Sequence, residues 1–158
     1  VIPLQTKVCK SFLTTRMKES SWKDCIECNS SISISKDKFK AKSLIETTLG
    51  RNGFLNKNKL EENNANYIFE GYYSSAVELL HALILIKGYK VINHICLGFY
   101  LRDVMNETKL FRLFDDCRFK RNSLVYYGRK MDFETAKESI KNCKKLIKEL
   151  NKILEKNE

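Results

Sequence analysis

The residue with the clearest capacity for chemistry is Arg121, which lies on an otherwise apolar stripe of a predicted helix. The apolar residues before it follow at steps of three and four: Leu110, Phe114 and Cys117. A guanidinium on such a face is costly unless an anion pairs with it. One explanation is an internal ion pair with Asp103 or Asp116. The other is a groove between helices or subunits, in which the planar fork of Arg121 meets phosphate oxygens.

A second stripe of the same helix is polar. It consists of Asp115, Arg118, Asn122 and Tyr126. These side chains are three or four residues apart, so neighbours along the stripe can touch one another. Arg118, Asn122 and Tyr126, together with Arg121, are the residues around which we expect a composite basic groove.

The charge distribution agrees with an anionic partner. The net charge is +10, and residues 1–60 carry 12 Lys and Arg against 5 Asp and Glu. Residues 109–158 carry 14 against 8, whereas residues 61–108 carry 3 against 6. A basic surface built from the two ends suits RNA or a nucleotide. A lysine-rich solvated surface without a partner explains the charge alone equally well.

The elements that must position these residues are predicted to be helices. One proline and six glycines in 158 residues leave few helix breakers, and the abundance of Leu, Lys, Glu and Ile favours an all-α fold. Apolar residues at three- and four-residue steps predict an up-and-down bundle of about five helices. The expected helices cover residues 36–60, 64–87, 92–105, 107–127 and 132–154, with residues 37–158 forming the bundle.

Residues 1–36 are expected to form an N-terminal accessory arm. Short helices are plausible around Phe12–Met17 and Trp22–Cys28. The serine-rich segment at residues 29–35 is interpreted as a linker or extended arm, although its alternation of Ser and Ile also allows a short strand.

We expect a cytoplasmic protein with no membrane contact. No apolar run approaches the length of a membrane span, and no signal peptide is recognisable. The six cysteines are then expected to be thiols, with Cys96, Cys117 and Cys143 as small core residues. Cys25 and Cys28 have half of a zinc-site spacing, but no second pair follows them, so we predict no metal and no cofactor.

The segment Phe119–Gly128, FKRNSLVYYG, resembles the signature of the HEPN family of helical domains. The segment Tyr72–Leu83, YYSSAVELLHAL, is similar to the family's second helix, and Phe133–Leu154 is similar to its last. The resemblance covers residues 37–154 and leaves out the N-terminal arm. It implies a helical bundle that pairs as a homodimer. It also implies a relation to metal-independent endoribonucleases, often toxins partnered by a minimal nucleotidyltransferase antitoxin.

The family motif is an arginine, usually followed by a polar residue such as asparagine, and then a histidine after four to six residues. The resemblance therefore implies catalytic roles for Arg121, Asn122 and the residue at the histidine position, which is Tyr126 here. Toxin-type members carry a tyrosine two residues later, where this chain has Gly128. The residues expected to contact nucleic acid are Arg118, Lys120, Tyr127 and Arg129.

The tyrosine at position 126 decides how much activity we expect. A tyrosine ordinarily titrates near a pKa of about 10, so it moves protons poorly at neutral pH. We therefore predict a homodimer that binds RNA or nucleotide with weak or absent nuclease activity, its interface including exposed Phe99 and Phe111. An active ribonuclease toxin and a non-catalytic module that docks a nucleotidyltransferase or other protein remain alternatives. His94 could approach the motif from another element.

Overall fold

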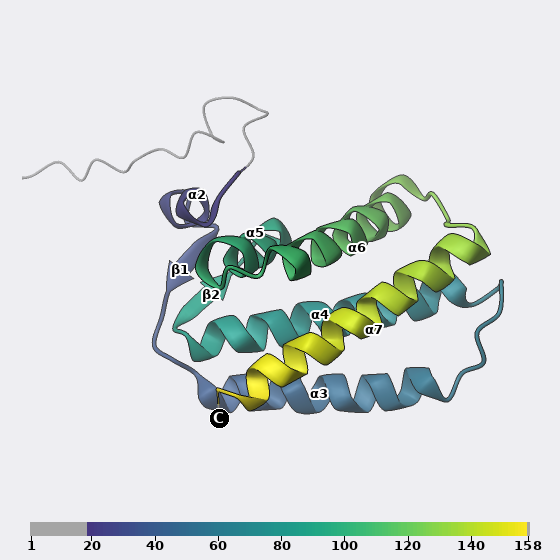
Figure 1. Cartoon of the computed structure of the whole chain (residues 1–158), viewed down its shortest axis with the longest axis horizontal. Helices are drawn as coiled ribbons and strands as arrows, with labels where there is room; N and C mark the ends of the chain where they lie inside the picture. Colours follow the sequence, from purple (N-terminus) through teal and green to yellow (C-terminus); the bar gives the residue numbers. More distant parts are fainter. Residues whose placement is uncertain (1–18, 158) are drawn as a thin grey trace, which may run out of the picture.

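The structure, a computed structural model, describes residues 19–157 (Figure 1). The predicted all-α class is confirmed, because helices make up the body and the described chain has one small sheet of two short strands. None of the described helices is long and apolar enough to cross a membrane. In chain order the elements are α2 (Trp22–Glu27), β1 (Ser31–Ser33), α3 (Lys38–Asn56), α4 (Ala65–Ile86), β2 (Tyr89–Val91), α5 (His94–Phe99), the π-helix η1 (Tyr100–Val104), α6 (Thr108–Tyr127) and α7 (Phe133–Glu155).

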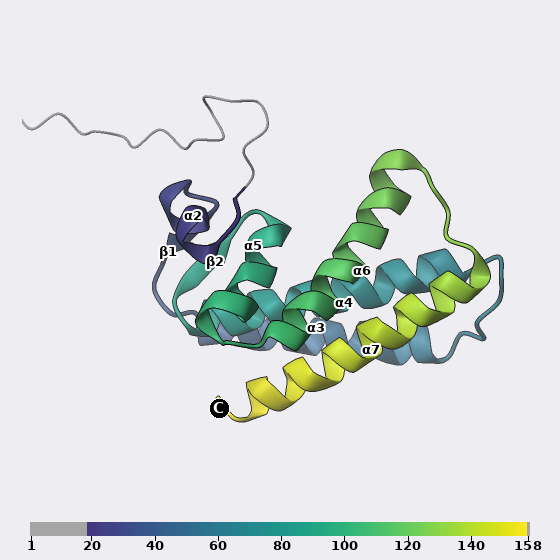
Figure 2. The ribbon, with the colours of Figure 1, turned by 45° about the horizontal axis from the view of Figure 1, so that its top comes forward.

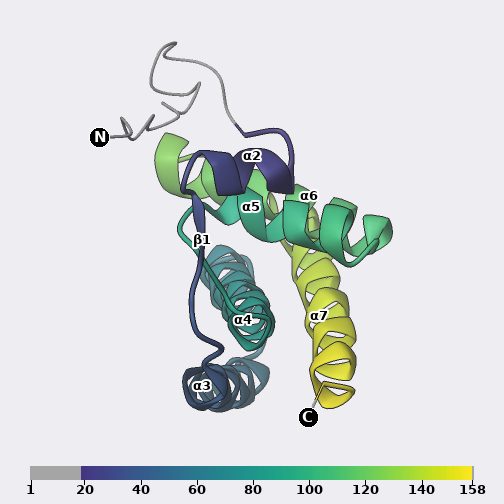
Figure 3. The same cartoon turned by 90° about the vertical axis from the view of Figure 1, so that its left-hand side faces the viewer.

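Helix α4 is the centre of the fold, and it is the helix with the longest apolar run. It packs against α3 and α7, while α5 and α6 lie over the side of α4 that faces away from α3 (Figure 3). Burial extends around most of its circumference, as expected for a helix covered on several sides. It ends before Gly88, whose backbone has a φ of 91°, a conformation that favours glycine.

The ends of α6 and α7 follow the predicted signals. Helix α6 stops at Gly128, which is left-handed with a φ of 61°. Asp132 caps α7, because its side chain accepts a hydrogen bond from the backbone N–H of Thr135. The predicted seam of α7 is buried from Ala136 to Leu154. Figure 2 shows the C-terminal end of α6 rising away from α7, so the last turns of α6 have a free side.

Three residues of the serine-rich segment, Ser31–Ser33, form a strand, which is the alternative that the alternation of Ser and Ile allowed. Ser31–Ser33 pairs antiparallel with Tyr89–Val91, and flanking bonds join Ile34 N–H to Gly88 O and Ile92 N–H to Ser30 O. The partner strand β2 lies almost 60 residues further along the chain. The turn at Gly88, between α4 and β2, lets β2 run antiparallel to β1. The described part of the arm is therefore attached to the helical body by a β-ladder.

A disulfide joins Cys25 in α2 to Cys96 in α5, so the prediction that these two cysteines are thiols is wrong. Cys28 is also disulfide-bonded, so the prediction is wrong for this residue too. Their Cα atoms are 6.0 Å apart although 71 residues separate them in sequence, a proximity that only the tertiary fold creates. Cys117 and Cys143 are buried thiols whose Sγ atoms are 3.6 Å apart between α6 and α7, as expected of small core residues.

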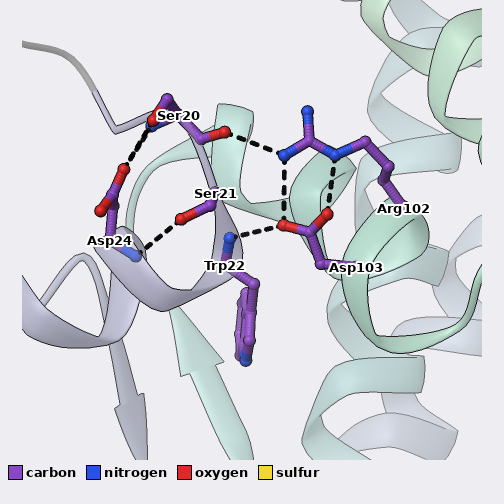
Figure 4. A network of polar contacts seen from close by, with 6 residues as sticks. All are labelled: Ser20, Ser21, Trp22, Asp24, Arg102 and Asp103. Carbon is purple, nitrogen blue, oxygen red and sulfur yellow. Dashed lines mark hydrogen bonds and ion pairs between the residues drawn. The ribbon is translucent and has the colours of Figure 1, made fainter.

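The predicted third helix is divided into α5 and the π-helical turn η1. In η1 the backbone N–H of Met105 bonds the carbonyl of Tyr100, five residues earlier. The turn presents Arg102 and Asp103 to the start of α2 (Figure 4). Asp103 Oδ2 accepts a bond of 2.8 Å from the Trp22 N–H, and Arg102 Nη2 donates one of 2.9 Å to the Ser20 carbonyl.

Candidate functional site

A polar groove lies between the start of α5 and the C-terminal half of α6. Its volume is about 500 Å³. One wall is the segment Ile92–Ile95, and the other is α6. The residues that line the α6 wall are Arg118, Arg121, Asn122 and Tyr126. The structure thus brings together the three predicted catalytic residues and one of the predicted nucleic-acid contacts.

Arg121 makes no ion pair with any residue that the structure describes. Its guanidinium carbon lies 5.6 Å from the ring centroid of Tyr73 and 5.8 Å from that of Tyr126. Aromatic faces hold a cation at this range with about 0.5–2 kcal/mol, and they leave its N–H donors free for other acceptors.

The internal ion pair proposed for Arg121 is therefore wrong for both named carboxylates. Asp103 binds Arg102 at 2.7 Å, and Asp116 binds Lys120 at 2.9 Å. In both cases the carboxylate pairs with a basic residue within one turn of its own helix. Such a local pair forms without bringing distant parts of the chain together. The hydrogen bond from Arg102 holds the pKa of Asp103 below its ordinary value.

Arg118 contributes the second guanidinium of the groove. Its Nε and Nη2 donate to Asp115 Oδ1 at 3.0 and 2.8 Å, as the spacing along the polar stripe predicted. This pair fixes the side chain and balances its charge locally, while three of its five N–H donors remain available. The unbalanced positive charge of the groove therefore resides mainly on Arg121.

His94 is the residue that the motif alone did not assign to this site. It begins α5, directly after the cap Asn93, whose Oδ1 accepts a bond from the Ile95 N–H. Its Nδ1 lies 3.3 Å from the hydroxyl of Tyr73. The pKa of His94 is lowered, first by burial and then by the charges of Arg121 and Arg118. At neutral pH the ring is uncharged and can accept a proton.

Tyr73 connects these groups from beneath the groove. It is buried in α4, stacks on Phe114 with ring planes 9° apart, and contacts both Arg121 and His94. Burial raises its pKa, so its hydroxyl stays protonated and bonds the imidazole in either direction. His81 lies behind His94, with the ring centroids 6.2 Å apart. Burial and the nearby His94 lower the pKa of His81 to about 4.

Three of the predicted nucleic-acid contacts lie outside the groove. Lys120 points its amine to Asp116. Tyr127 is 73% exposed at the last position of α6, and Arg129 follows the Gly128 cap on the exposed connection to α7. None of the three lines the groove, and only Tyr127 and Arg129 continue the chain beyond its last lining residue, Tyr126.

The expected exposure of Phe99 at a dimer interface is wrong. Phe99 is 5% exposed, and its ring packs 6.0 Å from that of the partly buried Phe111. The exposed apolar side chains of α6 are instead close to its free C-terminal end: Phe119, Val125, Tyr126 and Tyr127. We call these four residues the aromatic tip of α6.

No metal site accompanies the groove within residues 19–157, since no three His, Cys, Asp or Glu side chains gather there in a way that could hold an ion. Cys25, half of the zinc-like spacing, is used in the disulfide to α5. Comparison of the chain with family models, curated proteins and solved structures finds no match, so any assignment of function depends on the chemistry of the groove.

Proposed function

We propose that this chain is a HEPN-like homodimer that binds RNA or nucleotide through phosphate contacts in the groove, with weak or absent nuclease activity. The observation behind this proposal is that the guanidinium of Arg121 has no ion-pair partner in the described chain. Its guanidinium lies in a polar groove against two aromatic rings, and no carboxylate of the described chain pairs with it. A structural arginine would have its charge balanced internally.

The neighbours of Arg121 suit a nucleotide. Arg118 supplies a second, fixed fork for phosphate oxygens. The Asn122 amide makes no hydrogen bond within residues 19–157 and can read a base edge or a sugar hydroxyl. Tyr126 is 71% exposed and offers a ring on which a base can stack.

The weak activity follows from the residue at position 126. In the family that the motif resembles, the ribose 2′-hydroxyl attacks the neighbouring phosphate, and a side chain that titrates near neutral pH moves the protons. Loss of such a group costs about 10²- to 10⁴-fold in rate. Tyr126 can hold a phosphate oxygen or donate a proton, but it is a poor base at neutral pH.

The dimer is proposed to form around the aromatic tip of α6. The tip is exposed and lies beside the groove, on the end of α6 that rises away from α7 (Figure 2), so a twofold axis near it would bring two grooves together. Two copies of Arg121 would then concentrate positive charge on one face. The aromatic tip also favours a second candidate function, a non-catalytic module that docks a nucleotidyltransferase or another protein.

The test is Arg121→Ala, with Arg112→Ala as the matched control. Arg112 is exposed on the same helix and lies outside the groove, so both variants remove one positive charge. Loss of a charge-assisted phosphate contact should weaken binding of a fluorescent oligoribonucleotide by about 1–3 kcal/mol, or roughly 5- to 150-fold. The control should change affinity by less than about threefold, since an exposed charge acts through the screened field alone.

Thermal melting of the same samples separates binding from structure. Arg121→Ala should melt close to wild type, because no buried ion pair is broken. A much lower melting temperature, together with wild-type protein that does not bind the oligonucleotide even at low salt, would refute the proposal. That result would favour the protein-docking module instead.

We also propose a cytoplasmic location, which requires that the disulfide of this chain is stable in that compartment. The Cys25–Cys96 disulfide must persist there, as disulfides do in intracellular proteins of hyperthermophiles but seldom in other cytosols. Alkylation of protein from freshly lysed source cells, followed by mass measurement, checks whether the bond is present in the cell.

A further inference from the structure

We propose that His94 is the acid–base group of the groove and takes the proton of the ribose 2′-hydroxyl when bound RNA is cleaved. This inference rests on the proposed RNA binding. It assigns the proton transfer to a residue on α5, opposite the α6 motif, in place of the tyrosine at position 126.

The first support is position. His94 shares one groove with Arg118, Arg121, Asn122 and Tyr126, so a phosphate held by the two guanidiniums lies beside an imidazole. The segment Ile92–Ile95 is fixed on both sides. The β1–β2 ladder precedes it, and the disulfide at Cys96 ties the following turn to α2. The histidine therefore sits on a rigid wall, as an acid–base group requires.

The second support is the hydrogen bond to Tyr73. For Nε2 to take a proton, Nδ1 must carry the other hydrogen and donate it, and the Tyr73 hydroxyl lies 3.3 Å from Nδ1. Tyr73 is itself fixed by burial and by stacking on Phe114. It thus orients the imidazole and can accept the hydrogen of Nδ1 in the tautomer that leaves Nε2 free, and we regard it as a positioning residue.

The third support is the charge around the ring. Within residues 19–157, the titratable and charged groups around His94 are Tyr73 and His81 from α4 and, in the groove, Arg118, Arg121 and Tyr126 from α6. None is an anion, and both guanidiniums favour the uncharged imidazole. His94 is therefore ready to accept a proton at neutral pH. A bound phosphate would offset the two guanidiniums and make the imidazole more basic as the substrate arrives.

The proposed cleavage needs no reactant other than the RNA and the side chains of the groove. The 2′-oxygen forms a bond to the adjacent phosphorus, and its proton passes to Nε2 of His94. The bond from phosphorus to the 5′-oxygen breaks, and that oxygen takes a proton from the Tyr126 hydroxyl. Exchange with water then returns both side chains to their starting states. The products are a 2′,3′-cyclic phosphate and a 5′-hydroxyl, and the weak acidity of tyrosine keeps the step slow.

The experiment compares wild type, His94→Gln and His81→Gln on one fluorescent oligoribonucleotide, with binding measured on the same samples. Glutamine keeps a polar group near Tyr73 but cannot take a proton. We expect slow wild-type cleavage that leaves the cyclic phosphate, and a fall of about 100-fold or more in His94→Gln with affinity unchanged within about threefold. His81→Gln lies outside the groove and should cleave like wild type. Because the two variants are prepared identically, a difference in cleavage between them excludes a contaminating ribonuclease.

The pH profile is a readout that a structural role would not change. The uncharged imidazole is the active form, so kcat/KM should rise with pH and level off below about 6.5, the ordinary pKa from which His94 is lowered. His94→Gln should lack this rise. Tyr126→His should increase cleavage by supplying a better proton donor, and this increase should be lost when His94→Gln is added.

Two results would overturn the assignment and leave RNA binding intact. One is wild type that binds the oligonucleotide but does not cleave it at any pH between about 5 and 9. The other is cleavage that His94→Gln leaves unchanged. If wild type does not bind RNA at all, the proposed function itself fails.

Discussion

Replacing Cys25 and Cys96 together by alanine should lower the free energy of unfolding by about 4 kcal/mol. In the chain-entropy treatment, a cross-link removes roughly 2.1 + 1.5R ln n cal/mol/K from the unfolded chain, where n is the number of residues in the closed loop. The two cysteines are 71 residues apart. At 25 °C this separation corresponds to about 4.4 kcal/mol, a large share of the roughly 5–15 kcal/mol by which a domain is stable.

The assay is urea unfolding followed by circular dichroism, with thermal melting as a second measurement. A loss of about 4 kcal/mol should lower the melting temperature by roughly 8–16 °C for a chain of this size. The urea slope should also increase, because an unfolded chain without the cross-link exposes more surface. This increase identifies an effect on the unfolded state, which loss of packing alone would not produce.

The matched control replaces Cys117 and Cys143 by alanine. These two buried thiols share a hydrogen bond of 3.6 Å but no disulfide, so their removal changes packing but closes or opens no loop. The control should lose less stability and keep the wild-type urea slope. A Cys25 and Cys96 variant that stays within about 1 kcal/mol of wild type, with the same slope, would refute the loop-closure reasoning.

Two further predictions concern packing and assembly. Gly98→Ala should destabilise the fold by about 1–3 kcal/mol in urea unfolding, because the added Cβ would lie 3.1 Å from ring atoms of Phe111 and Phe114. Gly53→Ala, where nothing lies within 4 Å of the added carbon, should not destabilise it, and a loss equal to that of Gly98→Ala would contradict the packing argument. Light scattering at micromolar concentration should give twice the 18.5 kDa chain mass, and Phe119→Ser should shift that mass towards the monomer. A wild-type mass of one chain would exclude the shared-groove arrangement.

The helices were predictable because their signals are local. The capping aspartate Asp132, the glycine at 128 and the three- and four-residue steps of α4 and α7 each act within a few turns of chain. The strand β1 was not predictable in the same way. Its ladder partners begin at Tyr89, and nothing in the serine-rich segment itself specifies that pairing.

The site shows the same division between local and tertiary information. The spacing of Arg118, Asn122 and Tyr126 predicted one polar face, and the groove contains all three. The place of His94 depends on how α5 crosses α6, which no local pattern encodes. The partners of Asp103 and Asp116 were misjudged for the opposite reason, since the basic residues that bind them are on the same helical turn.

The π-helical turn η1 determines the angle around the helix axis between two residues that hold the arm, Cys96 and Asp103. An α-helix advances by about 100° per residue, and a π-turn inserts one residue without lengthening the helix proportionately. Cys96 lies before η1 and bonds α2, whereas Asp103 lies within it and accepts from Trp22. Deleting one residue of η1 would rotate one attachment by about 100° relative to the other. The extra residue therefore lets a single short helix be held by both a covalent bond and a carboxylate clamp.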